Sequence, residues 1–273
     1  KGPAGIVRSI GNDVAGLSPG DRVVAMCEPG GGYAELVSVP ANQCHRIPDA
    51  MPFEAAASMA LIYDTAWFAL RERGRYQPGE SVLVLGASGG VGLATIQLAK
   101  ALGAHVLAGV SNPDKFHLAS EAGADTIIEL DGPDLRNSLR DQVFAATGGH
   151  GADIMIDPLG DIYFEAALRA LAWCGRLVVV GFAAGSIPSV KANYLLVKNI
   201  EVAGLQIGDY RKRAPEKTAV CFKELFALYE AGEIGPLATT TMLLENVQDA
   251  LRAIRERTAL GRMVLIQDDE PQA

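Results

Sequence analysis

The chain has 273 residues, of which 49% are hydrophobic and 21% are charged, and this balance excludes a disordered or fibrous protein. Its formal net charge of −8 provides no broad basic surface for nucleic acid or for an anionic membrane. No apolar segment approaches the roughly 20 residues that span a bilayer. We therefore expect neither nucleic acid nor a membrane as a partner.

The first part of the chain, residues 1–57, predicts a small and mostly β unit. Turn signals at Ser18-Pro19-Gly20 and at 29–32 follow one another closely, which is typical of short strands joined by tight connections. Strands are expected at 5–10, 21–26 and 33–39.

From about residue 53 the pattern changes to a helix over 53–70, followed by a regular alternation of strands and helices. Runs such as Val82-Leu83-Val84-Leu85 are apolar throughout, as in parallel strands that are covered on both faces. This pattern predicts an α/β fold with a doubly wound parallel Rossmann sheet. Strands are expected at 81–85, 105–110, 126–130, 152–157, 177–182, 200–205 and 263–266, and helices at 91–102, 113–122, 135–146, 162–173, 216–231 and 247–257.

A glycine-rich turn, Gly86-Ala87-Ser88-Gly89-Gly90-Val91-Gly92, lies between the first of these buried strands and the next helix. In that position, glycines let the backbone approach a pyrophosphate, and the N–H groups at the helix N-terminus face its negative charge. Ser88, Gly89, Gly90 and Val91 are the predicted contacts. A tight turn without a ligand is the alternative, but the strand before the turn and the helix after it favour a dinucleotide.

The end of the following strand indicates which dinucleotide is bound. NAD enzymes place a carboxylate there for the ribose 2′-hydroxyl, whereas this strand ends at Val110-Ser111 without one. Ser111 and Lys115 suit a 2′-phosphate, and Asn112-Pro113 resembles a helix N-cap and first helical position. NADPH is therefore favoured over NADH, although Lys115 on a solvated helix face is the alternative.

Short motifs follow one another in a fixed order along nearly the whole chain. They include Gly20-Asp21-Arg22-Val23, Gly31-Gly32-Tyr33-Ala34-Glu35, Thr65-Ala66, the segment 79–84, the glycine-rich turn, Gln97-Leu98-Ala99-Lys100, Val179-Val180-Gly181-Phe182 and Gly261-Arg262-Met263-Val264-Leu265. With these motifs the sequence resembles the zinc-free quinone oxidoreductase branch, which is ζ-crystallin-like, of the medium-chain dehydrogenase/reductase superfamily.

This resemblance implies a mostly β, GroES-like catalytic domain built from both chain ends, with the Rossmann domain inserted into it. The expected limits are 1–57 and 206–273 for the catalytic domain and 58–205 for the NADPH-binding domain. Further residues normally precede the segment 2–11 in the family. The catalytic domain is therefore expected to be N-terminally incomplete here, and any targeting signal would lie in that missing part.

The resemblance also implies the site residues. Further cofactor contacts would come from the turn Gly181-Phe182-Ala183 and from the segment Leu205-Gln206-Ile207. Tyr63 and Thr65 would approach the nicotinamide and substrate in the cleft between the domains, although ordinary helix packing explains these two residues equally well. No other acid–base residue is assigned.

No metal site is expected. A zinc site needs four closely spaced thiolates or three protein ligands, whereas Cys27, Cys44, Cys174 and Cys221 are widely separated. Cys44 is followed directly by His45, and adjacent side chains on a strand point to opposite faces. Widely spaced cysteines also make the reducing cytoplasm the default location.

Together these features predict zinc-independent hydride transfer from NADPH to a quinone or an α,β-unsaturated carbonyl compound, which is a small electrophilic substrate. An enoyl-thioester reductase acting on acryloyl-CoA or an enoyl-ACP is one alternative, and a non-catalytic, crystallin-like NADPH-binding protein is another. Arg211-Lys212-Arg213 is the local candidate for a basic thioester entrance, although a solvated loop is the simpler prediction for it. The strand 200–205 is expected to join two copies into a homodimer.

Overall fold

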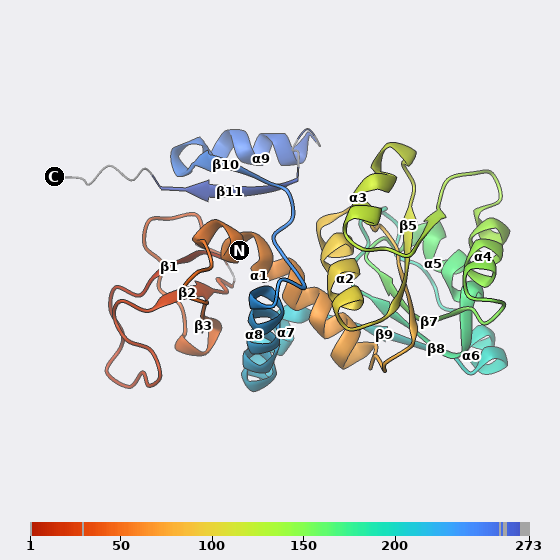
Figure 1. Ribbon diagram of the computed structural model, residues 1–273, viewed down its shortest axis with the longest axis horizontal. Coiled ribbons are helices and arrows are strands. Elements are labelled where there is room, and N and C mark those ends of the chain that lie inside the picture. The colour runs from red at the N-terminus through yellow and green to blue at the C-terminus, as the bar shows by residue number, and fades with distance from the viewer. Residues whose placement is uncertain (1, 29, 257, 259–260, 268–273) are drawn as a thin grey trace. The chain divides into compact units, whose positions relative to one another are not determined.

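The computed structural model describes residues 2–28, 30–256, 258 and 261–267. The chain divides into two compact units, one formed by Lys1–Asp64 with Gly208–Ala273 and the other by Thr65–Ile207 (Figure 1). The second unit is thus one continuous stretch of sequence. The first unit is formed by the chain segments that precede and follow it. The predicted domain limits at 57/58 and 205/206 stay predictions, and the compact units divide at 64/65 and 207/208.

The continuous unit contains a six-stranded sheet in the order β6-β5-β4-β7-β8-β9, with every described neighbour pair parallel. Its strands are β4 (Ser81–Val84), β5 (His105–Val110), β6 (Thr126–Glu129), β7 (Ala152–Asp157), β8 (Leu171–Val179) and β9 (Glu201–Gly204). The strand order reverses between β4 and β7, which defines the topological switch point of a doubly wound sheet. The predicted α/β fold is therefore confirmed.

Helices cover both faces of this sheet (Figure 1). On one face, Leu139 and Val143 of α4 and Phe164 of α5 are buried with Leu83, Leu107 and other side chains of the sheet in a single core. Because β4 is buried along its whole length, the apolar run that predicted it is explained by cover on both faces. The helices are α2 (Gly90–Ala101), α3 (Phe116–Glu121), α4 (Leu135–Ala146), α5 (Asp161–Ala170) and α6 (Ala192–Lys198).

One boundary in this unit differs from the prediction. The helix expected over 162–173 ends at Ala170, and β8 begins at Leu171 rather than at residue 177. The pairing of β8 with β7 shifts register between Ala152 and Ile154, and Cys174 has a φ of +60°. Because apolar residues continue across this boundary, the sequence pattern alone predicts a helix that ends too late in the chain.

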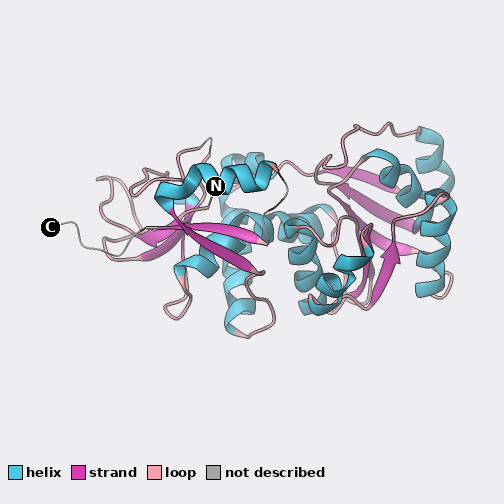
Figure 2. Cartoon of the chain, turned by 90° about the horizontal axis from the view of Figure 1, so that it is seen from above, coloured by secondary structure: helices cyan, strands magenta, loops and turns pink. Residues whose placement is uncertain are grey.

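The other unit contains the antiparallel sheet β1-β2-β3 and the parallel pair β10-β11 (Figure 2). The strand predicted over 33–39 is wrong, because residues 33–36 form bends and residues 37–39 have no regular structure, and the third strand is instead Cys44–Arg46. The elements of this unit are β1 (Ala4–Ile6), β2 (Arg22–Ala25), β3 (Cys44–Arg46), β10 (Thr239–Leu243), β11 (Arg262–Ile266), α1 (Phe53–Trp67), α7 (Ile207–Arg213), α8 (Pro215–Glu230) and α9 (Val247–Arg255). Both α1 and α7 extend across a unit division.

Arg211 forms a buried ion cluster in this unit. It lies on α7 with a side chain only 2% exposed, and its Nε donates to Asp64 Oδ2 at 2.9 Å. Its two terminal nitrogens donate to Asp64 and to Glu28. The prediction of a solvated loop for residues 211–213 is therefore wrong, because all three residues lie on α7 and because Arg211 is buried against two carboxylates from distant segments. Lys212 and Arg213 are exposed.

Candidate functional site

The glycine-rich turn is anchored to both strands that neighbour β4. Leu85 N–H donates to the Ile156 carbonyl oxygen of β7, and Ala87 N–H donates to the Gly109 carbonyl oxygen of β5, each at 3.0 Å. The turn closes through Gly89 N–H, which donates to the Gly86 carbonyl oxygen at 3.0 Å. Helix α2 then begins at Gly90. The chain therefore reverses in a fixed geometry at the switch point of the sheet.

Two positions in this turn require glycine. Gly86 has a φ of +59°, and a Cβ there would lie 2.9 Å from Leu159 Cδ2. A Cβ on Gly92 would lie 2.4 Å from the Gly86 carbonyl oxygen and 2.7 Å from Ala87 Cα. At Gly92 the clashing atoms belong to the backbone, so only glycine permits this close approach of α2 to the end of β4, whereas at Gly86 the left-handed backbone conformation favours glycine.

The four predicted contacts in the turn lie together at the N-terminus of α2. Gly89 is exposed, and Ser88, Gly90 and Val91 are partly exposed. The first N–H groups of a helix have no acceptor within the helix, and its dipole adds positive potential at that end. This arrangement can bind a phosphate through backbone N–H groups at the carboxyl end of β4.

Ser111 and Lys115 follow the carboxyl end of β5, which lies beside β4, and both are exposed. Asn112 caps the short helix at Pro113–Lys115, because its side-chain oxygen accepts from Asp114 N–H at 3.0 Å. The predicted N-cap and the first-turn proline are thus confirmed. A hydroxyl and an ammonium group are therefore available at the same edge of the sheet.

The remaining predicted cofactor residues follow the carboxyl ends of β8 and β9. Gly181 N–H donates to the Asp157 carbonyl oxygen at 3.4 Å, Ala183 N–H donates to the Pro158 carbonyl oxygen at 3.0 Å, and Phe182 between them is 43% exposed. Beyond β9, Leu205 is buried, Gln206 is exposed and Ile207 is half-buried. All twelve predicted residues therefore lie at the carboxyl edge of one sheet, where ligands of doubly wound folds bind. Their contacts with a cofactor stay predictions.

Tyr63 and Thr65 are buried on α1. The Tyr63 hydroxyl donates to the Gly235 carbonyl oxygen at 2.6 Å, within its own unit, and burial raises the pKa of Tyr63 well above its usual value. This environment keeps the phenol protonated and gives it a packing role. An acid role for either residue stays a prediction.

Asp157 is a residue at this edge to which the sequence analysis assigned no role. It ends β7 and is fully buried. Its Oδ1 accepts hydrogen bonds from the N–H groups of Leu159 at 2.8 Å and Gly160 at 2.9 Å. Burial raises the pKa of this carboxyl above its ordinary value, although the two hydrogen bonds oppose the shift. The sequence signal that could have found it is a carboxylate at the end of an apolar strand, followed directly by Pro158-Leu159-Gly160.

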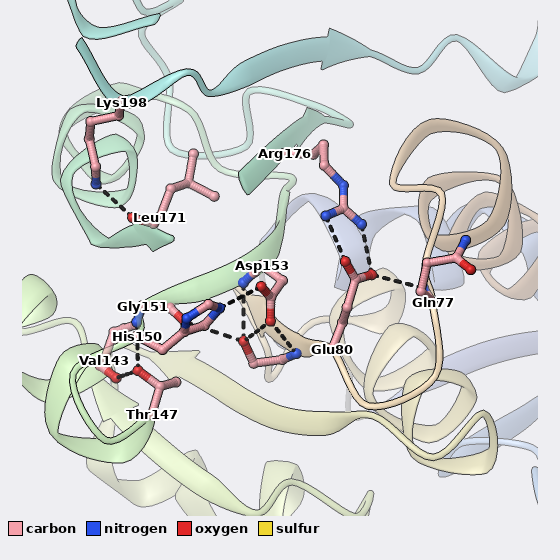
Figure 3. Close-up of polar contacts among 11 residues, drawn as sticks. Gln77, Glu80, Val143, Thr147, His150, Gly151, Asp153, Leu171, Arg176 and Lys198 are labelled. Carbon is pink, nitrogen blue, oxygen red and sulfur yellow. Dashed lines mark hydrogen bonds and ion pairs between the residues drawn. The ribbon is translucent and has the colours of Figure 1, made fainter. Parts of the chain in front are cut away.

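A second polar cluster lies at the opposite, amino edge of the same sheet (Figure 3). Asp153 Oδ2 accepts from Ser81 N–H at 2.9 Å and from Ser81 Oγ at 2.8 Å, and Asp153 Oδ1 lies 2.7 Å from His150 Nε2. Because the carboxylate lies between the hydroxyl and the imidazole, the histidine is not placed to take the serine proton as in a hydrolytic triad. Beside it, Arg176 binds Glu80 through two hydrogen bonds of 2.7 Å. These contacts tie β4, β7 and β8 together.

We expect Asp153→Ala to lower the free energy of unfolding by about 1–3 kcal/mol, because Ser81 N–H and Oγ would lose a half-buried acceptor. Burial raises the pKa of Asp153, but its hydrogen bonds outweigh that effect and lower it below 3.8. The stabilisation is therefore present above the unfolded pKa and lost as pH falls through the lowered value. Urea unfolding at neutral and acidic pH measures both effects. His150→Ala, at a side chain that is 59% exposed, should cost much less.

Two cavities of about 460 and 300 Å³ occur among the described residues of the continuous unit, on the side of α4, α5 and α6. None of the predicted cofactor residues lines either of them. The candidate site is therefore the carboxyl edge with its anion-binding backbone rather than either cavity.

Within residues 2–28, 30–256, 258 and 261–267, no group of three or more His, Cys, Asp or Glu side chains could hold a metal ion. His45 instead stacks on Phe222 with ring centroids 4.1 Å apart. Burial, together with the charge of Arg211, lowers the pKa of His45 to about 4, so the imidazole is neutral and serves packing. In the part of the chain that the structure describes, no helix has both the length and the apolar character needed to cross a membrane.

Two family models match the chain. Residues 2–49 match the alcohol dehydrogenase GroES-like domain, and residues 90–223 match the zinc-binding dehydrogenase family. The first match contains β1, β2 and β3, and the second begins in the glycine-rich turn. The two matches therefore agree with the fold of each unit.

Relatives and solved structures give the branch of this family. The "Quinone oxidoreductase-like protein 2" of Bos taurus is 37% identical over 264 residues, which are 96% of this chain and 74% of that protein. The structure of a mycobacterial quinone oxidoreductase aligns with a TM-score of 0.88 at 30% identity and covers 96% of this chain and 80% of that one. The Escherichia coli quinone oxidoreductase, solved in complex with NADPH, aligns with a TM-score of 0.84 at 30% identity over 96% and 80% of the two chains. The chain therefore belongs to the medium-chain dehydrogenase/reductase superfamily, in its quinone oxidoreductase branch.

Proposed function

We propose that this protein is an oxidoreductase that uses NADPH to reduce a quinone or another α,β-unsaturated carbonyl compound. The observation that carries the proposal is the glycine-rich turn at the switch point, where Gly86 and Gly92 bring the N-terminus of α2 against the end of β4. The relatives support the reaction class, because the Bos taurus relative is named a quinone oxidoreductase-like protein and the two solved structures described above are named quinone oxidoreductases.

The residues at the carboxyl edge fit a dinucleotide phosphate. Backbone N–H groups of Ser88, Gly90 and Val91 would hold the pyrophosphate beside Gly89, whose own N–H closes the turn. The Ser111 hydroxyl and the Lys115 ammonium would hold a 2′-phosphate, while the segments 181–183 and 205–207 would line the rest of the cofactor. The cofactor supplies the hydride, and the chain binds and orients it, so no acid–base residue of this chain is assigned.

We expect Lys115→Ala to weaken NADPH binding about tenfold and to leave NADH binding nearly unchanged, because one charge-assisted hydrogen bond to a phosphate contributes about 1.5 kcal/mol. Fluorescence titration with both cofactors measures this difference. Lys191→Ala, another exposed lysine of the same unit, is the control. An equal loss for NADPH and NADH, or no loss at all, would contradict the 2′-phosphate role of Lys115.

The proposed activity is tested by following NADPH oxidation by the full-length protein with 1,4-benzoquinone, 9,10-phenanthrenequinone and crotonyl-CoA. We expect turnover with the quinones. Turnover of crotonyl-CoA alone would favour the enoyl-thioester reductase, and tight NADPH binding without turnover of any acceptor would favour the crystallin-like alternative. The structure offers fewer basic residues for a thioester entrance than the sequence suggests, because Arg211 is buried in an ion cluster.

We also propose a homodimer that forms through the segment 200–205. β9 ends the strand order of the sheet, so its outer edge is open to pairing among the described strands. On α6, which precedes it, Leu196 and Val197 are 79% and 77% exposed, and apolar side chains of this kind are commonly covered in oligomers. Light scattering of the full-length protein should give the mass of a dimer, and a purely monomeric mass would refute this assembly. The cytoplasmic location stays a prediction.

A further inference from the structure

The turn that follows β7, Asp157-Pro158-Leu159-Gly160, contacts both glycine turns of the candidate site. On one side, a Cβ on Gly86 would lie 2.9 Å from Leu159 Cδ2 and 3.4 Å from Pro158 Cγ. On the other side, the N–H groups of Val180 and Gly181 donate to the Asp157 carbonyl oxygen, at 2.8 and 3.4 Å.

The same turn is held still more closely to the segment 181–184. Ala183 N–H donates to the Pro158 carbonyl oxygen and Ala184 N–H to the Leu159 carbonyl oxygen, each at 3.0 Å. A Cβ on Gly160 would lie 2.9 Å from Phe182 Cδ1. A displacement of the turn 157–160 would therefore displace both segments that are predicted to contact the cofactor.

The side chain of Asp157 holds this turn in place. Its carboxyl is fully buried, and Oδ1 accepts the N–H groups of Leu159 and Gly160 at 2.8 and 2.9 Å. Oδ2 is also buried, and it has no hydrogen-bond partner among the described residues. Oδ1 therefore fixes the turn. When the carboxyl is ionised, no hydrogen bond from a described residue stabilises negative charge on Oδ2.

Among the described residues, no counter-charge contacts the Asp157 carboxyl. Its neighbours in the sheet are apolar, with Val179 of β8 as its register partner and Val84 of β4 paired to the preceding Ile156. The adjoining helix α5 has the titratable residues Asp161, Tyr163 and Glu165. Burial raises the pKa of Asp157, and its hydrogen bonds with Gly160 and Leu159 oppose this shift. Burial thus favours the neutral acid.

We propose that Asp157 is a positioning residue for the dinucleotide, which holds the turn 158–160 between the two glycine turns, and that dinucleotide binding favours its protonated form. This inference rests on the proposed cofactor function. A pyrophosphate at the N-terminus of α2 brings negative charge to the switch point, and like charges in a poorly hydrated site oppose one another. Binding therefore takes up one proton from solvent onto Asp157 wherever the free protein is ionised and the complex is not.

The test measures NADPH binding by calorimetry from pH 5.5 to 8.5, in pairs of buffers that differ in ionisation enthalpy, for the full-length protein and for Asp157→Asn. The asparagine keeps the Oδ1 acceptor but cannot ionise. The probe's own 2′-phosphate titrates near pH 6, so the quantity of interest is the difference in proton uptake between the two proteins. We expect greater uptake by the unmodified protein, and an affinity that falls with rising pH more steeply than in Asp157→Asn.

Two further variants separate positioning from stability. Asp157→Ala removes the acceptor and should weaken NADPH binding at least tenfold, whereas Asp157→Asn should weaken it less than threefold near the acidic end of the range. Asp153→Asn makes the same change at the amino end of the same strand, and it should lower stability without altering proton uptake.

The outcomes distinguish a failure of the proposed role of Asp157 from a failure of the proposed NADPH-dependent function. Binding with equal proton uptake by the unmodified protein and Asp157→Asn would overturn the inference and leave the proposed function standing. The inference also fails, and the proposed function also stands, if Asp157 variants lose stability but keep the affinity and pH profile of the unmodified protein. No NADPH binding by the unmodified protein would overturn both. If Asp157→Ala does not fold, the comparison with Asp157→Asn still decides the inference.

Discussion

Replacement of Gly92 by alanine is expected to weaken dinucleotide binding at the candidate site by about a hundredfold or more. The new Cβ would lie 2.4 Å from the Gly86 carbonyl oxygen and 2.7 Å from Ala87 Cα. Both atoms belong to the backbone, so no side-chain rotation relieves the clash, and either α2 or the end of β4 must move. A misplacement of about 1 Å can lower the rate of an enzyme about a hundredfold, and we expect a loss of at least this size in NADPH affinity.

Titration with NADPH and thermal unfolding together measure this effect. Strain in a close-packed region should also lower the free energy of unfolding by about 1–3 kcal/mol. Gly5→Ala is a suitable control, because a Cβ there meets nothing within 4 Å. Full NADPH affinity in Gly92→Ala would show that the turn 86–92 is not the phosphate site.

Arg211→Met is expected to lower the free energy of unfolding by about 3–5 kcal/mol, because it removes the guanidinium that is paired with the buried carboxylate of Asp64. Asp64 is fully buried, and Glu28 contacts the same guanidinium. Urea unfolding gives the change in free energy. Lys212→Met, on the same helix but exposed, should change it by less than about 0.5 kcal/mol.

A double variant tests whether the cost arises from the lost charge pairing. Adding Asp64→Asn to Arg211→Met removes the buried carboxylate of the ion cluster, so the double variant should be more stable than Arg211→Met alone. Such non-additivity is the signature of residues in direct contact. A double variant that is less stable by the sum of the two single losses would mean that charge is not the cause.

Sequence patterns predict the continuous unit well, because local signals determine its elements. The ranges of β5, α4 and β7 agree at both ends with the predicted 105–110, 135–146 and 152–157. Glycines and the periodicity of apolar residues mark clearly where these elements begin and end. The segment 33–39 is rich in apolar residues like a strand, yet a strand also needs a partner, and this composition does not specify one.

The residues that were mispredicted or missed depend on partners far away in sequence. From the sequence, Arg211 is predicted to be one residue of a solvated basic segment. Its side chain is instead buried, because it pairs with Asp64 and Glu28, which lie 147 and 183 residues away in sequence. Asp157 reads as an ordinary turn residue at a strand end. The positioning role inferred for Asp157 depends on the packing of β4 and β8 on either side of β7. It can therefore be inferred only when the strand order is known.

The division of the chain also determines the order in which its parts can fold during synthesis. All six strands of Thr65–Ile207 exist before Gly208 is made, so this unit can fold on the ribosome as soon as it emerges. The residues up to Asp64 belong to a unit that is complete only after β11. Until the later segments are made, Asp64 lacks Arg211 and the ring of His45 lacks Phe222. The segment before residue 65 is therefore the part of the chain for which we expect the longest dependence on chaperones.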